Sequence, residues 1–429
     1  MSRRGNGVHK YIAKTVQRSS RRLGPGLISG AADDDPSGIA TYSQAGAQFG
    51  FNMLWTVVLT YPLMVGIQMV SARIGRVTGK GLTANIRDRY PRWLLYSIVS
   101  LLVTANTINI AADIAAMGDA LRLVAGGGAH GHAIVFGALS LLLQVFMPYQ
   151  RYVRVLRWLT LSLLAYVAVL LMVHVPWGEA LKHTLVPSLS FNADFITVVV
   201  AVFGTTISPY LFFWQASQEV EEMRADPRGA ALVKSPQIAR RHLLRIKIDT
   251  YLGMGFSNLI AFFIILSTAV TLHAAGITEI QTSAQAAEVL RPLAGDLTFF
   301  MFSMGIIGTG MLAVPVLAGS AAYAMADSFG WNQGLDRKLY EAKEFYAIIA
   351  LATVGGVLLD FTPVHPIQAL FWSAVINGVI AVPIMAMMML MAARPEVMGP
   401  FVVSRRLNIL GWCATATMLA AVIGMFAAR

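Results

Sequence analysis

Three consecutive carboxylates stand before a proline in the segment Gly30-Ala-Ala-Asp-Asp-Asp-Pro-Ser-Gly38. Successive residues of a helix step by about 100°, so Asp33, Asp34 and Asp35 cannot all lie on one face. Pro36 removes a backbone donor and clashes with the preceding turn. We therefore expect an unwound segment with free carbonyl groups and at least one inward carboxylate, and such oxygens suit a hard cation. A surface loop between two shorter helices is the alternative interpretation.

A second segment, Phe203-Gly-Thr-Thr-Ile-Ser-Pro-Tyr210, offers similar oxygen chemistry without charge. Pro209 frees carbonyl groups about one turn back, near Thr205. Thr205 and Ser208 are three residues apart and share a helix face, so their oxygens could lie opposite Asp35. The alternative is a proline kink in which the hydroxyl groups satisfy the freed backbone.

Two further polar residues lie within long apolar runs. Asp113 is ionisable, and such a residue in a membrane span is functional by default. It could relay protons or pair with a basic group such as Arg122 or Lys343, and the sequence favours neither. Asn377 could reach the site of the two segments, although a hydrogen bond between helices explains it somewhat better.

Five other polar residues receive structural interpretations. Asn106 and Asn109 could reach the site as well, although hydrogen bonds between helices explain them somewhat better. Glu219, Glu221 and Glu222 are expected to form a solvated charge run rather than a vestibule that collects cations.

The composition places these groups in a membrane protein. Of the 429 residues, 56% are hydrophobic and 13% are charged, and the mean hydropathy is +0.62. A soluble domain carries about 25% charged residues. The composition therefore excludes a soluble globular enzyme, a disordered protein and a nucleic-acid module. The single cysteine, Cys413, excludes a disulfide framework and a cysteine metal site.

Runs of about 20 mostly apolar residues predict an all-α polytopic membrane protein with about eleven transmembrane helices. The predicted spans are 24–48, 53–72, 93–121, 132–148, 157–175, 194–218, 248–272, 297–323, 345–361, 367–392 and 407–427. The loops test this count, because 29 of the 33 Lys and Arg residues fall on one side when the N-terminus is placed inside. This asymmetry is a strong positive-inside signal. It predicts a location in the cell (inner) membrane, with a cytoplasmic N-terminus and the C-terminus outside.

The first and sixth spans are each broken near the middle by a proline with small polar neighbours, and each opens a block of five spans. A pair of interrupted spans at corresponding positions indicates the midplane binding site of an inverted-repeat transporter. We therefore predict four regions. They are a basic cytoplasmic tail at 1–23, five-helix repeats at 24–175 and 176–393, and an extra C-terminal helix within 394–429.

Four segments carry motifs that occur together in one family. They are Leu23-Gly-Pro-Gly-Leu-Ile-Ser-Gly30, Asp35-Pro-Ser-Gly-Ile-Ala-Thr41, Gln44-Ala-Gly-Ala-Gln-Phe-Gly50 and Ser71-Ala-Arg-Ile-Gly-Arg-Val-Thr-Gly-Lys80. With the third span, where Asp113 stands at a recurrent acidic position, they resemble the Nramp family of divalent metal transporters. The resemblance covers most of the chain. It implies a LeuT-like fold with the metal bound between spans one and six, a metal-binding carboxylate at Asp35 and a carbonyl ligand at Thr205.

The chain departs from this family where the metal binds. The family motif Asp-Pro-Gly-Asn is Asp35-Pro-Ser-Gly38 here, so the asparagine ligand is missing. The family motif Met-Pro-His is Ser208-Pro-Tyr210, so the thioether and the histidine are missing as well. The acidic residue that the family has seven positions before Asp113 is Asn106, and the basic pair of span nine has no clear match. The proton route of the family therefore does not carry over cleanly.

These departures change the expected metal. A thioether favours softer transition metals, whereas oxygen ligands suit Mg²⁺, Ca²⁺ and Mn²⁺. Gly38 and Ser208 leave room for the waters that Mg²⁺ keeps, and the set resembles the magnesium-transporting branch related to Nramp. The expected metal ligands are Asp35, Thr205 and Ser208. Further candidates for ligation or support of the metal are Gly38, Asp34, Tyr210 and Asn377, and the candidate proton relay is Asp113.

Together these observations predict secondary transport of a divalent cation, with Mg²⁺ or Mn²⁺ favoured, by alternating access. No nucleotide-binding motif is present, so no ATP drive is expected. The alternative is a symporter of the same fold for an organic solute such as an amino acid, although Asp35 would repel a carboxylate unless the substrate carries an amine. An enzyme is not expected, because no catalytic motif is visible. The expected partners are the lipid bilayer and the metal substrate, with no cofactor, nucleic acid or obligatory protein partner.

Overall fold

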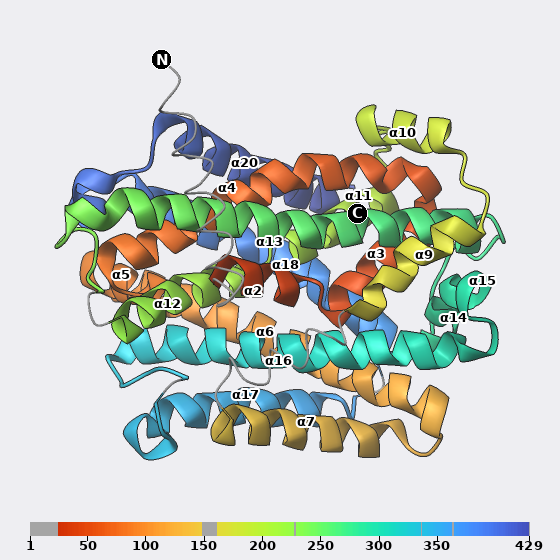
Figure 1. Cartoon of the computed structure of the whole chain (residues 1–429), viewed down its shortest axis with the longest axis horizontal. Helices are drawn as coiled ribbons and strands as arrows, with labels where there is room; N and C mark the ends of the chain where they lie inside the picture. The colour runs from red at the N-terminus through yellow and green to blue at the C-terminus, as the bar shows by residue number, and fades with distance from the viewer. Residues whose placement is uncertain (1–24, 148–160, 227–228, 336, 363, 429) are drawn as a thin grey trace, which may run out of the picture.

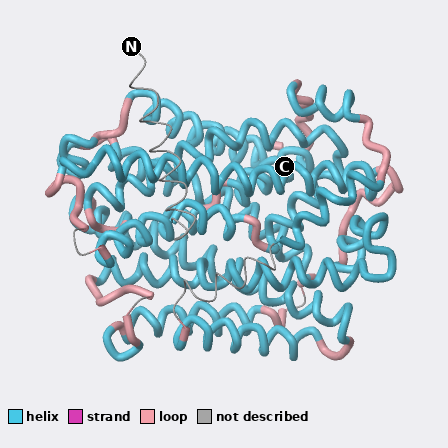
Figure 2. The backbone as a smooth tube through the Cα atoms, in the orientation of Figure 1, coloured by secondary structure: helices cyan, strands magenta, loops and turns pink. Residues whose placement is uncertain are grey.

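The computed structural model describes residues 25–147, 161–226, 229–335, 337–362 and 364–428. Every regular element in these ranges is a helix, and the long helices run side by side along one axis of the molecule (Figure 1 and Figure 2). The prediction of an all-α polytopic protein is confirmed. The predicted basic tail, residues 1–23, lies outside the described ranges.

The helices that correspond to the predicted spans follow the order of the chain. They are α2 (Pro25–Asp33) with α3 (Pro36–Phe49), α4 (Leu54–Thr78), α6 (Arg92–Ala125), α7 (Ala129–Phe146), α9 (Leu164–Met172), α11 (Ala193–Thr206) with α12 (Pro209–Ala225), α13 (Ala239–Thr268), α16 (Thr298–Phe329), α17 (Lys343–Leu359), α18 (Pro366–Ala392) and α20 (Arg405–Ala427). Short helices at the ends of the bundle are α5 (Leu82–Arg89), α10 (Trp177–Leu185), α14 (Ser283–Ala287), α15 (Arg291–Ala294) and α19 (Pro395–Met398).

Single turns complete the described structure. The 3₁₀ turns are η1 (Gly50–Met53), η2 (Leu161–Leu163), η3 (Pro236–Ile238), η5 (Glu288–Leu290), η6 (Gly295–Leu297), η7 (Leu339–Glu341) and η8 (Gly399–Phe401), and η4 (Ala269–His273) is a π-helical turn at the end of α13.

Eight helical segments of the described residues are long and apolar enough to cross a membrane. One of these segments, Pro36–Thr78, contains both α3 and α4, which η1 separates. Two predicted spans remain outside this set. One contains the shorter apolar helix Leu161–Met172, and the other is α17 with 17 residues.

Both helices that the sequence predicts to be interrupted are interrupted at their prolines. Pro36 begins α3 and Pro209 begins α12. Because a proline has no N–H, it cannot donate to the carbonyl four residues earlier. The carbonyl groups of Ala32 and Thr205 therefore lack the partner that a continuous helix would supply.

The two breaks lie in the middle of the bundle. The helices α6, α7, α16 and α17 pack on one another and form the lower side of the molecule in Figure 1. Helix α2 lies between α13 and α16, and α11 packs on α18 and α3. The broken helices are thus enclosed by longer, unbroken ones.

Two glycines allow α2 to approach α13 closely. Gly26 and Gly30 are four residues apart, and small residues at this spacing let two helix backbones come together. A Cβ atom on Gly30 would lie 2.3 Å from the backbone of Gly253, and one on Gly26 would lie 2.8 Å from the backbone of Asp249. Backbone atoms cannot turn aside as a side chain can, so the position of α2 depends on these glycines.

Gly30→Leu should therefore displace α2 from α13. Overpacking of this kind is expected to lower the melting temperature of the detergent-purified protein by about 1–3 °C. The matched control is Gly178→Leu on α10, where a Cβ would meet nothing within 4 Å. Equal melting temperatures for the two variants would contradict the close packing of α2 on α13.

Candidate functional site

The Asp35 carboxylate is buried at the first break and lies within hydrogen-bonding distance of four donors. Its Oδ1 accepts from the N–H of Gly38 and from the hydroxyl of Ser37, each at 2.7 Å. Its Oδ2 accepts from Nδ2 of Asn109 at 3.0 Å and lies 3.5 Å from the hydroxyl of Tyr210. Asp35 is thus the N-cap of α3 and stands at the positive end of that helix's dipole.

Asn109 connects this carboxylate to two other helices. It lies on α6, its Nδ2 donates to Asp35, and its Oδ1 accepts from the hydroxyl of Ser373 on α18 at 2.6 Å. Asn106, one turn away, donates to the hydroxyl of Ser320 on α16 at 2.7 Å. The predicted hydrogen bonds between helices are confirmed for both asparagines. The sequence did not indicate that the partner of Asn109 is Asp35.

At the second break, the hydroxyl of Ser208 faces its own backbone. It lies 3.0 Å from the carbonyl oxygen of Gly204 and 2.6 Å from that of Thr205. A hydroxyl that satisfies a carbonyl freed by Pro209 is the arrangement predicted for a proline kink. The Thr205 carbonyl is therefore occupied in this conformation.

The hydroxyl of Thr205 lies beside the first break. It is buried and has no hydrogen-bond partner among the described residues. A Cβ atom on Gly38 would stand 3.3 Å from it. The absence of a side chain at Gly38 therefore keeps space between α3 and α11, next to an oxygen that is free to accept.

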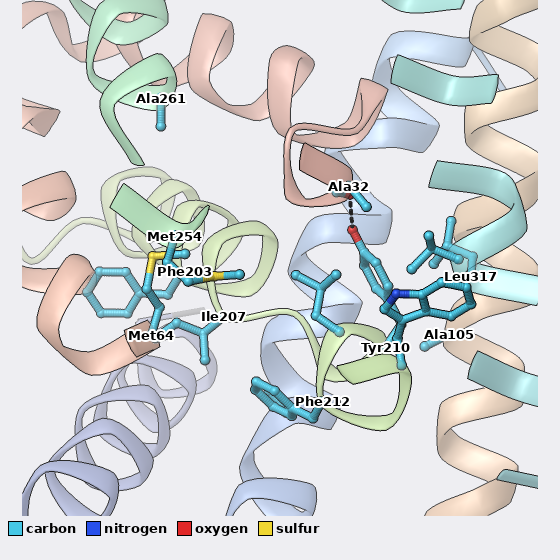
Figure 3. Close-up of a cluster of buried hydrophobic side chains, with 14 of the residues drawn as sticks. Ala32, Met64, Ala105, Phe203, Ile207, Tyr210, Phe212, Met254, Ala261 and Leu317 are labelled. Atoms are coloured by element: carbon cyan, nitrogen blue, oxygen red, sulfur yellow. Dashed lines mark hydrogen bonds between the residues drawn. The ribbon is translucent and has the colours of Figure 1, made fainter. Parts of the chain in front are cut away.

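Tyr210 joins the two breaks. It lies in the first turn of α12, with its ring 1% exposed, and its hydroxyl donates to the carbonyl of Ala32 at 3.0 Å (Figure 3). That carbonyl is the one that Pro36 leaves without a helical partner. Each carbonyl that a proline has freed thus accepts a hydrogen bond from a hydroxyl group at the start of α12. The carbonyl of Ala32 accepts from Tyr210, and that of Thr205 accepts from Ser208, the N-cap residue.

Asp33 and Asp34 are also buried, and both meet α13. The hydroxyl of Ser257 lies 2.5 Å from Oδ2 of Asp33 and 3.0 Å from Oδ1 of Asp34. The second oxygen of Asp33 has no partner among the described residues. Ser257 was not predicted, because a single serine in an apolar helix gives no signal of its role.

Asp113 is fully buried, and neither of its oxygens has a hydrogen-bond partner among the described residues. The predicted alternative of a pair with Arg122 or Lys343 is wrong. Arg122 lies about 13 Å further along α6 and pairs with Asp119 at 2.5 Å. Lys343 is exposed at the start of α17. Asp113 therefore has no basic partner among the residues that the structure describes.

Asn377 is buried on α18, beside the point where this helix meets α11. A Cβ atom on Gly204 would lie 2.5 Å from the backbone nitrogen of Gly378. The amide nitrogen of Asn377 has no partner among the described residues. The hydrogen bond between helices that the sequence favoured is therefore not made by this nitrogen.

Four aspartates near the breaks are buried without a basic partner among the described residues. Asp33, Asp34, Asp35 and Asp113 are all buried, and none takes part in an ion pair between described residues. A buried charge without a partner is costly, so such groups hold protons or a cation. No three His, Cys, Asp or Glu side chains of the described residues gather as a metal group. A metal bound here must also draw on carbonyl and hydroxyl oxygens.

One end of the bundle is closed by ion pairs. Arg245 on α13 pairs with Glu219 and Glu222 on α12, and Glu221 accepts from the hydroxyl of Tyr323 on α16. Glu219 is 1% exposed. The prediction of a solvated charge run is therefore wrong for Glu219 and Glu221, because α13 and α16 bring donors against α12 that lie far away in sequence.

The C-terminal part of α3, which leads away from Asp35, borders a cavity of about 320 Å³. Its walls include Ala40, Gln44 and Gln48, which lie four residues apart along the helix that begins after Asp35, together with residues of α18. Gln44 holds the segment 278–280 on α3, since it accepts from the N–H of residue 280 at 2.9 Å and lies 3.2 Å from the carbonyl of residue 278. The hollow thus lies on the side of Asp35 away from the ion pairs.

Comparisons with known proteins agree with this architecture. The family model described as natural resistance-associated macrophage protein-like (Nramp) matches residues 26–428. A protein named divalent metal cation transporter MntH from Acidiphilium cryptum is 29% identical over 393 residues, which is 89% of this chain and 84% of that protein. The MntH protein of Klebsiella pneumoniae is 25% identical over 426 residues, covering 95% of each chain.

Solved structures show the same fold. A manganese transporter from Eremococcus coleocola, in complex with an aromatic bis-isothiourea substituted compound, superposes with a TM-score of 0.75 at 16% identity and covers 94% of this chain and 86% of that one. The inward-facing structure of Mhp1 gives a TM-score of 0.54 at 14% identity, covering 94% and 90%. The predicted LeuT-like fold with broken helices one and six is confirmed. This chain is an integral membrane protein that belongs to the Nramp family.

Proposed function

We propose that this chain is a secondary transporter of divalent metal cations, with Mg²⁺ and Mn²⁺ favoured, and that it binds its substrate between the α2/α3 and α11/α12 breaks. The arrangement of Asp35 supports this most. A buried carboxylate without a basic partner among the described residues lies 3.5 Å from the Tyr210 hydroxyl, which donates to the carbonyl of Ala32 that Pro36 has freed. Gly38, whose N–H donates to this carboxylate, faces Thr205 of the second break. The names of the relatives, which are divalent metal cation transporters, support the same class of substrate.

The proposed ligands are the carboxylate of Asp35, the carbonyl of Thr205 and the hydroxyl of Ser208. All are oxygens, which suit hard cations. The unoccupied hydroxyl of Thr205 and the space at Gly38 lie beside them and can accept waters of a partly hydrated ion. Asp34, between α2 and α3, and Asn377, on α18, support the site, since both are buried and lie at or near a break.

Transport by alternating access requires one end of the bundle to be closed while the other is open. Here the end of α12 is closed by ion pairs, and the cavity borders the opposite end of α3. The basic loops predict that the α12 end faces the cytoplasm, so we propose that the cavity lies on the outer side of the buried site. We propose that the broken helices move against α6, α7, α16 and α17. The same proposal includes the division of the chain into two five-helix repeats, at 24–175 and 176–393, and an extra C-terminal helix within 394–429. It also places the protein in the inner membrane with its N-terminus in the cytoplasm.

A symporter for an organic solute explains the site less well. Helix N-termini in such proteins bind a substrate carboxylate, whereas four buried carboxylates surround the breaks here. Catalysis is not proposed, because the site offers no activated nucleophile or acid–base pair.

Asp35→Ala should abolish uptake of Mg²⁺ and Mn²⁺ into proteoliposomes, because it removes the charged ligand. Asp33→Asn and Asp34→Asn are the matched variants, since both residues are buried carboxylates on the same turn and both meet Ser257. They should keep more transport than Asp35→Ala. Uptake at the wild-type rate by correctly folded Asp35→Ala would overturn the assignment of the site.

Ser208→Met should shift selectivity towards soft metals, since a thioether prefers them. Competition of Cd²⁺ against Mg²⁺ in binding to the purified protein measures the shift, which we expect to be at least about tenfold. The wild type should bind Mg²⁺ and Mn²⁺ according to the ordinary affinity series. Tight Cd²⁺ binding by a wild type that ignores Mg²⁺ would contradict an all-oxygen site.

Proton coupling should be weak or absent. Tyr210 replaces the family's histidine and stays protonated near neutral pH, and Asn106 is neutral. Asp113 remains as the candidate relay, because it is buried without a partner. A pH-sensitive dye inside vesicles should report metal uptake without acidification. Strong acidification that is lost in Asp113→Asn would make Asp113 a proton carrier and overturn the prediction.

A further inference from the structure

The hydroxyl of Tyr210 lies beside one proposed ligand, the Asp35 carboxylate, and beside the Ala32 carbonyl that Pro36 has freed. It is 3.0 Å from the carbonyl oxygen of Ala32 and 3.5 Å from Oδ2 of Asp35. Its one proton can serve only one of these acceptors at a time. The ring is buried in the first turn of α12, directly after Pro209, so its hydroxyl moves away from Ala32 when α12 moves relative to α2.

We propose that the Tyr210 hydroxyl is a placeholder for the cation. In the empty transporter it donates to the carbonyl of Ala32 beside the Asp35 carboxylate, and it must leave before a divalent cation binds to these two oxygens. This inference rests on the function proposed above, and it assigns to Tyr210 the role of a positioning residue rather than that of a ligand.

The distances support displacement rather than sharing. Mg²⁺ binds oxygen at about 2.0–2.1 Å and Ca²⁺ at about 2.3–2.6 Å. A carbonyl oxygen has two lone pairs, so the competition is for space. The phenol oxygen lies 3.0 Å from the Ala32 oxygen and 3.5 Å from Oδ2 of Asp35, and a cation that bridges these two oxygens must take its place. The hydrogen bond from Tyr210 to Ala32 therefore opposes binding.

The same hydrogen bond ties two moving parts together. Ala32 is in the last turn of α2, and Tyr210 is in the first turn of α12. The bond from the phenol to the carbonyl thus holds the two inner half-helices against each other when no cation bridges the breaks. Its loss on binding allows them to separate, and its return after release helps the empty transporter to reset.

Tyr210→Phe keeps the ring and removes the hydroxyl. Titration calorimetry of the purified protein with Mn²⁺ should show tighter binding by about three- to tenfold, the value of one hydrogen bond that the cation need not break. The matched control is Tyr346→Phe. Tyr346 is also buried and also donates to a carbonyl, that of Arg337 at 2.8 Å, but it lies on α17 outside the site.

If the Mn²⁺ affinity of Tyr210→Phe is unchanged, the hydroxyl of Tyr210 has a purely structural role. If the affinity is weaker, the hydroxyl is a metal ligand. Either result overturns the proposal. Absence of Mn²⁺ and Mg²⁺ binding by the wild type would instead overturn the proposed function, so the two failures are distinguishable.

Two further readouts test the role of the bond. In proteoliposomes, Tyr210→Phe should slow net Mn²⁺ uptake more than exchange of internal for external Mn²⁺, because only net uptake requires the empty transporter to return. Equal slowing of both would contradict this role. In the wild type, Mn²⁺ should shift an infrared band of ring-labelled tyrosine, and the Tyr346→Phe variant should keep that shift. No shift in the wild type would also overturn the proposal.

Discussion

A carbonyl group inside a membrane must find a donor, and Pro36 and Pro209 each deprive one carbonyl of its own. The freed carbonyl oxygens of Ala32 and Thr205 accept hydrogen bonds from hydroxyl groups at the second break. Hydroxyl groups satisfy these carbonyls without locking them, since a side chain can rotate away and a helical N–H cannot. The breaks are therefore stable when empty and still able to present oxygens to a cation.

The buried carboxylates make the site between the two breaks suited to a positively charged substrate. Asp35 is stabilised by hydrogen bonds from the neutral donors of Ser37, Gly38 and Asn109 rather than by a basic side chain. Arginine in contact with it would satisfy the charge permanently and exclude a cation. The ion pairs of the structure lie instead near the ends of the bundle, where Arg245 joins α12 to α13. Charge compensation within the membrane is thus left to the substrate or to protons.

The features that could be predicted are those that depend on residues close together in the sequence. Apolar runs predicted the spans, the two prolines predicted the breaks, and Asp35 was identified because it directly precedes one of them. Long-range partners were not predictable. Ser257 carries no local signal, and Asn109 was noted as a polar residue within a span but without a specific partner. They reach the carboxylates because glycines let α2 pack closely against α13 and because α6 passes the break. Glu219 looked solvated for the same reason, since its partner on α13 is 26 residues away.

The most direct test of the central claim is the position of a bound ion. Crystals of the protein soaked in Mn²⁺ should give one strong anomalous peak between the two breaks, about 2.0–2.6 Å from the Asp35 carboxylate and the Thr205 carbonyl. The hydroxyl of Tyr210 should have moved away from Ala32 in that structure. A peak at Asp113 or beside Ser257, with Asp35 still hydrogen-bonded as it is in the empty protein, would contradict the account.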